Sequence, residues 1–397
     1  MSAPLQVGWL VWGDEQGGVA SAVINSIELA AVHGQTVSLW SFGPGCFVDT
    51  ARARGLTVHW LGESAERHRR YIAHGFSPLG VLRRGAVVLA MRKVLRAALQ
   101  ARPPLDVLCL PWADLMPLAG PVAKDCNIGL VMEMPSAPSR YPFDLNQRVY
   151  AWMARRWRVR ILANSVFTAS RLARVPGVMV MTPALDTTRF DPAQVQPLSR
   201  AALGIPARAL VIGLIARLDP AKGADLAIAA LAQLAEETPD LHLLLVGGPL
   251  NTAYAESLRE QVKQADLTAR VHWMNAVPDP ERYWAACDLA LNAYKGAEAF
   301  GLSIIEAMLM QRPVLAHSLG QPADTLEEGR TGWLFHEPTA AAVAQGLRRA
   351  LAAREQWPTM GQQARNEALR RFAGPTHGEH YLKLLREQAE RAHHLPS

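Results

Sequence analysis

The sequence predicts an α/β protein with two parallel-sheet domains, and three observations support this. The chain has 397 residues, against the ~150 residues usual for one domain. Short runs of Val, Ile and Leu alternate with longer stretches of helical periodicity, which is the pattern of parallel strands covered by helices. The alternation stops near residue 191 and begins again after residue 207. Half of the residues are apolar and 19% are charged, a balance that excludes a disordered or fibrous chain.

Twelve apolar runs predict the strands. Seven precede residue 191 and five follow residue 207: Val7–Val11, Val37–Trp40, Val58–Leu61, Val107–Leu110, Ile128–Met132, Arg160–Ala163, Val178–Met181, Leu210–Ile215, His242–Val246, Val271–Met274, Leu289–Asn292 and Val314–Ala316. Helical periodicity in the second half predicts helices at Ala224–Ala235, Thr252–Gln264, Pro280–Ala286, Leu302–Met310 and Ala340–Ala352.

The domain boundaries follow from the break in this alternation. Residues 191–207 contain three prolines and no apolar periodicity, so we expect a linker there. The first domain is then 1–190 and the second 208–375, and the polar helical stretch 376–397 is expected to pack back on the first domain. Because ligands of open α/β sheets bind beyond the carboxyl ends of the strands, we expect a cleft between the two domains.

The positive charge lies in the first half of the chain. Residues 1–206 carry 22 basic and 13 acidic side chains, against 19 and 22 in residues 207–397. The first half should therefore attract an anionic partner, namely a phosphorylated substrate, an anionic membrane or nucleic acid. Basic stretches at 67–70, 79–102 and 152–160 are candidates for membrane contact, although scattered cations in 79–102 favour a solvated helix face. No nucleic-acid-binding motif is present, so no nucleic acid is expected.

Cysteine spacing and hydropathy point to a reducing compartment. The four cysteines form no Cys-x-x-Cys pair, which argues against a disulfide framework or a thiolate metal site. The start of the chain reads as a first strand rather than a signal peptide, and no apolar run approaches ~20 residues. We expect a cytoplasmic location, at the inner face of the membrane if the basic domain docks there.

Two carboxylates flank a loop that becomes a helix. They are Glu298 and Glu306 in the segment Glu-Ala-Phe-Gly-Leu-Ser-Ile-Ile-Glu. Gly301 permits close approach of a ligand, and the amides of Phe300, Gly301 and Leu302 would point outward at the positive end of the helix. The amides suit a phosphate and the carboxylates suit sugar or ribose hydroxyls. An ordinary amphipathic helix with an early Glu is the alternative.

A second pattern places Arg217 and Lys222 on one strand-to-helix loop. A guanidinium and an ammonium five residues apart can clamp a diphosphate and stabilise its departure. Solvated loop cations are the alternative. A weaker element is Gly17-Gly18 after the first strand, a turn that can cradle phosphate. No Asp-x-Asp pair is present, so neither a bound metal nor another cofactor is expected.

In this order the motifs resemble the family 4 (group 1) nucleotide-sugar glycosyltransferases. Other matching stretches follow the same sequence order: Asn164–Thr168, Asp186–Phe190, Val246–Gly248, Arg312–Val314 and Gly329–Gly332. The resemblance implies the GT-B fold, in which two Rossmann-like domains face each other across a cleft, and a transfer that retains anomeric configuration.

The resemblance also implies roles for individual residues. Arg217 and Lys222 would bind the donor diphosphate, Glu306 the ribose and Glu298 the transferred sugar, and the amides of Phe300, Gly301 and Leu302 would lie around the sugar and phosphates. Gly17 and Gly18 would contact the phosphates from the other domain, and Val277 would line the base pocket.

Some positions depart from the family pattern. Many relatives have a His where this chain has the stretch around Glu133, which is either a substitute sugar or acceptor contact or a structural residue. Ala293-Tyr294 replaces a frequent Pro-Ser.

The expected function is a metal-independent retaining glycosyltransferase that uses a nucleotide sugar and an acceptor glycan, lipid-linked saccharide or small molecule. A nucleotide-sugar epimerase of the same fold and a catalytically silent nucleotide-sugar-binding paralogue are the alternatives. The sequence does not identify the sugar, the base, the acceptor or the oligomeric state.

Overall fold

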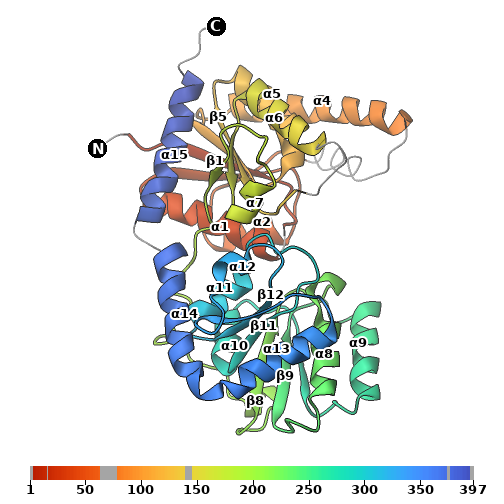
Figure 1. Ribbon diagram of the computed structural model, residues 1–397. Helices are drawn as coiled ribbons and strands as arrows, with labels where there is room; N and C mark the ends of the chain where they lie inside the picture. Colours follow the sequence, from red (N-terminus) through yellow and green to blue (C-terminus); the bar gives the residue numbers. More distant parts are fainter. Residues whose placement is uncertain (1–2, 16, 63–77, 139–144, 373–375, 394–397) are drawn as a thin grey trace. The chain divides into compact units, whose positions relative to one another are not determined.

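The computed structural model describes residues 3–15, 17–62, 78–138, 145–372 and 376–393 (Figure 1). Backbone contacts divide the chain into two compact units. The first unit is Met1–Leu185 together with Pro375–Ser397, and the second is Asp186–Gly374. Each unit is built around its own parallel sheet, as the repeated strand-helix alternation predicts.

The first unit contains seven strands and seven helices among its described residues. The strands are β1 (Gln6–Val11), β2 (Thr36–Ser41), β3 (Val58–Trp60), β4 (Val107–Leu110), β5 (Gly129–Met134), β6 (Arg160–Ala163) and β7 (Met179–Val180). The helices are α1 (Gly17–Val32), α2 (Cys46–Ala53), α4 (Pro78–Gln100), α5 (Met116–Asp125), α6 (Leu145–Trp157), α7 (Val166–Ser170) and α15 (Thr376–His393).

Helices cover both faces of the first sheet, whose strand order is β3-β2-β1-β4-β5-β6-β7. Alternate residues of each strand point to opposite faces. Trp9 and Val131 pack with α1 and α15, whereas Leu10 and Met132 pack with α4, α5 and α6. Both faces are therefore buried, which explains why the strands read as continuous apolar runs.

The C-terminal helix α15 completes the first unit. It packs against β5 and β4 and contacts α1 (Figure 1). Tyr381 and Leu385 are buried in the same cluster as Trp9. Gly129 lets the helix approach closely, because a Cβ at this position would lie 2.6 Å from the carbonyl oxygen of Gln388.

The described part of the second unit contains six strands and seven α-helices. The strands are β8 (Leu210–Ile215), β9 (Leu241–Val246), β10 (Val271–Met274), β11 (Leu289–Asn292), β12 (Val314–His317) and β13 (Gly332–Phe335). The helices are α8 (Ala224–Gln233), α9 (Ala253–Gln264), α10 (Pro280–Ala286), α11 (Leu302–Leu309), α12 (Pro322–Thr325), α13 (Ala340–Ala352) and α14 (Trp357–Phe372).

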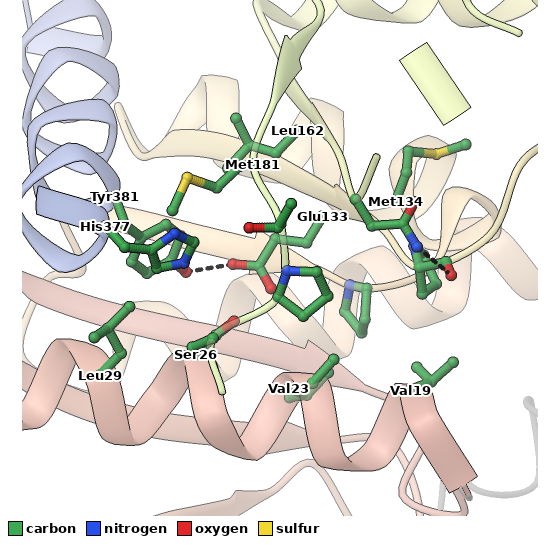
Figure 2. Close-up of a pocket in the computed structure, with 17 residues that line it drawn as sticks. Val19, Val23, Ser26, Leu29, Glu133, Met134, Leu162, Met181, His377 and Tyr381 are labelled. Atoms are coloured by element: carbon green, nitrogen blue, oxygen red, sulfur yellow. Dashed lines mark hydrogen bonds between the residues drawn. The ribbon is translucent and has the colours of Figure 1, made fainter. Parts of the chain in front are cut away.

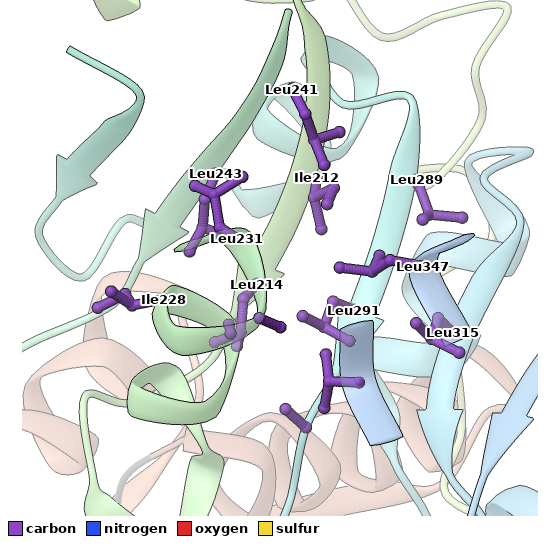
Figure 3. Packing of buried hydrophobic residues seen from close by; sticks show 14 of the residues in the cluster. Ile212, Leu214, Ile228, Leu231, Leu241, Leu243, Leu289, Leu291, Leu315 and Leu347 are labelled. Atoms are coloured by element: carbon purple, nitrogen blue, oxygen red, sulfur yellow. The ribbon is translucent and has the colours of Figure 1, made fainter. Parts of the chain in front are cut away.

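The second sheet has the order β10-β9-β8-β11-β12-β13, with all pairs parallel. Its first strand, β8, lies at the centre beside β11, and the chain winds outward in both directions from this pair. Ile212, Leu243, Leu291 and Leu347 belong to the apolar cluster on one face (Figure 3). The strand order reverses between β8 and β11, and ligands of open α/β sheets bind at such a switch point.

The expected linker, 191–207, packs within the second unit. Arg200 donates from Nη2 to both carboxylate oxygens of Asp288, each at 2.8 Å, and from Nη1 to the carbonyl of Ala209. Arg365 binds Asp191 at 3.1 Å. Arg200 of the segment and Arg365 of α14 thus hold in place a stretch whose own composition shows no apolar periodicity. No described helix is long and apolar enough to cross a membrane.

Candidate functional site

Two loops meet where the strand order of the second sheet reverses. One loop follows β8 and carries Arg217 and Lys222, and the other follows β11 and carries Glu298. The backbone N–H of Lys295 donates to the carbonyl of Ala221 at 2.8 Å, which ties the loops together. Gly223 has φ +75°, and a Cβ there would lie 2.0 Å from the carbonyl oxygen of Ala293. Only glycine fits this position without moving the backbone.

The structure brings Lys222 and Glu298 together, 76 positions apart in the sequence. The Nζ atom of Lys222 lies 3.6 Å from Oε2 of Glu298. The side chains are 27% and 14% exposed, so solvent reaches both. A cation and a carboxylate therefore occupy one partly exposed site at the switch point.

The backbone of Glu298 is fixed by the loop that follows β12. Its N–H donates to Leu319 at 2.9 Å, and its carbonyl accepts from the N–H of Gln321 at 2.9 Å. Gly320, at φ +105°, allows this approach, because a Cβ would lie 2.3 Å from the carbonyl oxygen of Glu298. The carboxylate is therefore presented from a backbone held on both sides.

Arg217 forms no ion pair with Glu298 among the described residues. Its side chain is 57% exposed, and Nη1 lies 3.9 Å from Oδ2 of Asp219. Asp219 also accepts from the N–H of Ala221 at 2.9 Å, which caps the short 3₁₀ turn that carries Lys222. The guanidinium is therefore at the surface of the same loop, with one weak ionic partner.

Helix α11 begins at Gly301, which has φ +86°. Among the described residues, the N–H groups of Phe300, Gly301 and Leu302 donate to no protein acceptor. Three amides at the positive end of a helix form a suitable anion site. The Phe300 side chain points into the core, where its ring packs edge-on against Phe372 at 5.5 Å.

Glu306 lies on α11 and faces α10. Its carboxylate accepts from Nε1 of Trp284 at 3.4 Å. Burial raises the pKa of Glu306, Trp284 and Arg189 oppose this shift, and Glu281 adds to it. No described contact joins Glu306 to Glu298, and a ligand that spans both carboxylates stays a prediction.

The remaining predicted donor residues lie elsewhere. Val277 is partly buried in the loop after β10, and Gly17 and Gly18 are exposed at the start of α1. Their roles toward a nucleotide stay predictions.

A second ion pair, which the sequence did not predict, lies on the same two loops as Lys222 and Glu298. Nζ of Lys295 binds Oδ2 of Asp225 at 2.7 Å, and the hydroxyl of Tyr254 donates to Oδ1 of the same carboxylate at 3.1 Å. Asp225 lies in the first turn of α8, where a carboxylate also stabilises the helix dipole. The sequence signal was Asp225, two residues after Gly223. An acidic residue near the start of a helix is too common to indicate an ion pair.

The first unit contains a separate pocket between α1 and α15 (Figure 2). Apolar side chains such as Val23, Leu162 and Met181 line most of it, and its volume of about 40 Å³ admits a few water molecules. Glu133 lies on its wall and accepts a short hydrogen bond from the hydroxyl of Tyr381.

Burial raises the pKa of Glu133 to about 7, and the hydrogen bond from Tyr381 partly offsets the rise, as do the nearby polar groups of Trp9 and Ser26. Glu133 thus anchors α15 through Tyr381. Of the two interpretations of Glu133, this contact favours the structural one. Nearby, Nε2 of His377 is buried without a partner among the described residues, and burial lowers its pKa.

Comparisons with solved structures define the class of fold. A glycosyltransferase from Rickettsia africae ESF-5 superposes with a TM-score of 0.82 over 98% of this chain and 99% of that one, at 18% identity. The Anabaena protein HepE, in complex with UDP and glucose, gives 0.78 over 96% of this chain and all of that one, at 22% identity. The predicted GT-B class, with two Rossmann-like parallel-sheet domains, is confirmed.

The family follows from the sequence of the second unit. Residues 195–367 match the family described as glycosyl transferases group 1. The D-inositol 3-phosphate glycosyltransferase of Streptomyces scabiei is 32% identical over 203 residues, which cover 47% of this chain and 45% of that protein. The relative from Nocardia farcinica is 31% identical over 218 residues, 52% of this chain and 48% of that protein. The chain thus matches about half the length of these curated relatives.

The contact between the two loops predicts a large cost for Gly223→Ala. The new Cβ would overlap the carbonyl of Ala293, and the left-handed φ of residue 223 adds strain for any side chain. We expect the free energy of unfolding to fall by roughly 3 kcal/mol, measured by urea denaturation. Gly329→Ala is the matched control, since its φ is +73° with nothing within 4 Å of the Cβ, and it should cost only about 1 kcal/mol. Equal losses in both variants would contradict the steric account.

The pKa of Glu133 predicts a pH-dependent stability. The folded protein holds a proton on Glu133 up to about pH 7, whereas the unfolded chain releases it near 4.5. Stability is therefore lost as pH rises through this window. Glu133→Gln removes the titration, so the variant should gain on the order of 2 kcal/mol relative to wild type between pH 4 and pH 8. Thermal melts at both pH values measure this, with exposed Glu379→Gln as control. A pH-independent difference would disprove the assignment.

Proposed function

We propose that this chain is a glycosyltransferase that transfers a sugar from a nucleoside-diphosphate sugar to a hydroxyl acceptor, with retention of configuration. The main support is the Lys222–Glu298 pair beside the α11 amides that donate to no described acceptor, within the segment that matches the group 1 family. An ammonium and amides suit a diphosphate, and a carboxylate suits sugar hydroxyls.

The donor we propose is a uridine-diphosphate sugar. Solved structures of HepE hold UDP with glucose, or UDP-glucose. At 22% identity this likeness guides the choice of the first ligand to test.

The reaction needs stabilisation of a departing diphosphate. The bond from the anomeric carbon to the phosphate oxygen breaks, and the acceptor oxygen bonds to the same carbon on the same face. The acceptor proton passes to the leaving phosphate. Negative charge grows on the diphosphate, where Lys222, Arg217 and the amides of residues 300–302 would stabilise it. We therefore propose that turnover needs neither a metal ion nor a protein nucleophile.

We propose that the acceptor carries phosphate and binds the first unit, whose sequence is rich in arginine. The name of the Streptomyces scabiei relative specifies an inositol phosphate, which gives this acceptor class support. The residues proposed to bind the donor diphosphate lie in the region with the family match, which is less basic than the first unit. Donor binding therefore does not account for the positive charge of the first unit.

Removal of either side chain of the Lys222–Glu298 pair should strongly reduce the rate of transfer. We expect Lys222→Ala and Glu298→Ala each to lower kcat/KM by about 100-fold or more, because each removes a group at the reacting centre. The assay measures UDP release from UDP-glucose with and without acceptor, in buffer containing EDTA. Exposed Lys263→Ala and Glu260→Ala on α9 are the controls.

Four outcomes separate the alternatives. Unchanged turnover in both clamp variants would contradict the assigned roles. Conversion of the donor to an epimer without acceptor would indicate an epimerase. Saturable UDP-glucose binding with no product from any acceptor would indicate a silent paralogue, and loss of activity in EDTA would overturn metal independence.

We also propose that α6 contacts anionic membranes. Leu145, Val149 and Trp152 are 59%, 46% and 57% exposed and lie at helical spacings of four and three residues. Exposed arginines lie on the same side of the helix, at positions 148, 155 and 156. At 100° per residue all six fall within an arc of about 120°. An apolar stripe mixed with cations suits a lipid interface.

Vesicle sedimentation tests this contact. Binding to phosphatidylglycerol-containing vesicles should fall by about 100-fold when Arg148, Arg155 and Arg156 become Gln, at ~1 kcal/mol per cation. Pure phosphatidylcholine vesicles should bind weakly. Arg348→Gln on α13, in the second unit, is the control. Equal binding to both vesicle types, or no binding, would contradict the proposal.

A further inference from the structure

Tyr294 lies beside Lys222 at the meeting point of the two loops. The Nζ atom of Lys222 is 4.3 Å from the centroid of the Tyr294 ring. The same atom is 3.6 Å from Oε2 of Glu298. The loop after β11 therefore contacts the Lys222 ammonium twice, once through an aromatic ring and once through a carboxylate.

The backbone of Tyr294 is held from two directions. Its N–H donates to Oδ1 of Asn292 at 3.3 Å, and its carbonyl accepts from Nδ1 of His317 at 2.8 Å. The His317 ring is buried and stacks on Phe335 at 5.3 Å. Strands β11, β12 and β13 thus fix the point from which the Tyr294 side chain leaves the backbone.

A glycine leaves room for the ring. A Cβ at Gly296 would lie 3.3 Å from two carbon atoms of the Tyr294 ring and 3.4 Å from its hydroxyl. These distances are at the lower limit of side-chain packing, so a larger residue would push the ring from its position. Gly296 and Lys222 both contact the ring and limit its movement.

Charged residues of the two loops affect the pKa of the Tyr294 hydroxyl. Burial raises the pKa of Tyr294, Glu298 and Asp219 add to the rise, and Arg217 opposes it. The hydroxyl therefore stays protonated at neutral pH. Tyr294 thus contacts Lys222 directly, and the charges of Glu298, Asp219 and Arg217 act on its hydroxyl.

We propose that Tyr294 is a positioning residue that holds the Lys222 ammonium in place for the donor diphosphate, an inference that rests on the proposed function. A lysine side chain is long and flexible, so ordering it on binding is costly. The electron-rich face of the ring attracts the ammonium and restricts its range before the ligand arrives. A prepositioned cation binds more tightly because less freedom is lost.

The residue type at position 294 distinguishes this chain from the family pattern. Tyr294 stands where the family pattern has a frequent Ser, whose hydroxyl offers no aromatic face. The Tyr294 ring matters as a second partner of Lys222, because Glu298 alone would attract the ammonium toward its carboxylate. The ring supplies an attraction that leaves the N–H donors of the ammonium available to phosphate oxygens.

The test compares Tyr294→Phe with Tyr294→Leu. Phe keeps the ring, and Leu keeps apolar bulk without it. Calorimetric titration with UDP should give a Kd within about threefold of wild type for Tyr294→Phe and about tenfold weaker for Tyr294→Leu. Uridine, which lacks phosphate, should bind all three proteins equally. Tyr150→Leu, in the first unit, is the matched control.

A double-mutant cycle excludes a merely structural role. In a Lys222→Met background, Tyr294→Leu should not weaken UDP binding further, because the cation that the ring holds is gone. Equal UDP affinity of wild type and Tyr294→Leu would overturn the inference, as would an equal loss for uridine or full additivity with Lys222→Met. If the wild-type protein binds no UDP, UDP-glucose or other nucleoside diphosphate, the proposed function itself fails.

Discussion

The contact between the backbones of Gly223 and Ala293 is the constraint on which the candidate site depends. At this point the loops after β8 and β11 approach so closely that a single Cβ would overlap a carbonyl oxygen at 2.0 Å. The strand order makes the approach possible, since β8 and β11 are neighbours and their carboxyl ends lie at the same sheet edge. A left-handed glycine then turns the chain into α8 without filling the gap.

Several features of the site follow from this contact. Lys222 precedes Gly223 directly, so its ammonium is brought within reach of Glu298 and the Tyr294 ring. Residues 300–302 follow on the same loop and open α11, and their amides donate to no acceptor in the described part of the chain. The second unit thereby combines cationic, aromatic and carboxylate groups around one small volume. This combination, more than any single residue, fits a nucleoside-diphosphate sugar.

Much of this was predictable because strands buried on both faces have a strong apolar signal. Every predicted strand exists within about two residues of its expected bounds, but β13 was missed because Gly332–Phe335 is short and begins with glycine. Helix α14 was missed because its first turn contains Pro358 and its polarity resembles a loop. The Glu133–Tyr381 bond and the Lys222–Tyr294 contact join residues far apart in sequence. Composition and spacing carry no signal for such pairs.

The most direct measurement is a crystal structure of this chain with UDP. The account predicts that the diphosphate lies within hydrogen-bond distance of Lys222 Nζ and of the amides of residues 300–302, with the Tyr294 ring still against the lysine side chain. A diphosphate bound elsewhere, or bound without contact to Lys222, would contradict the central claim that the loops after β8 and β11 form the donor site.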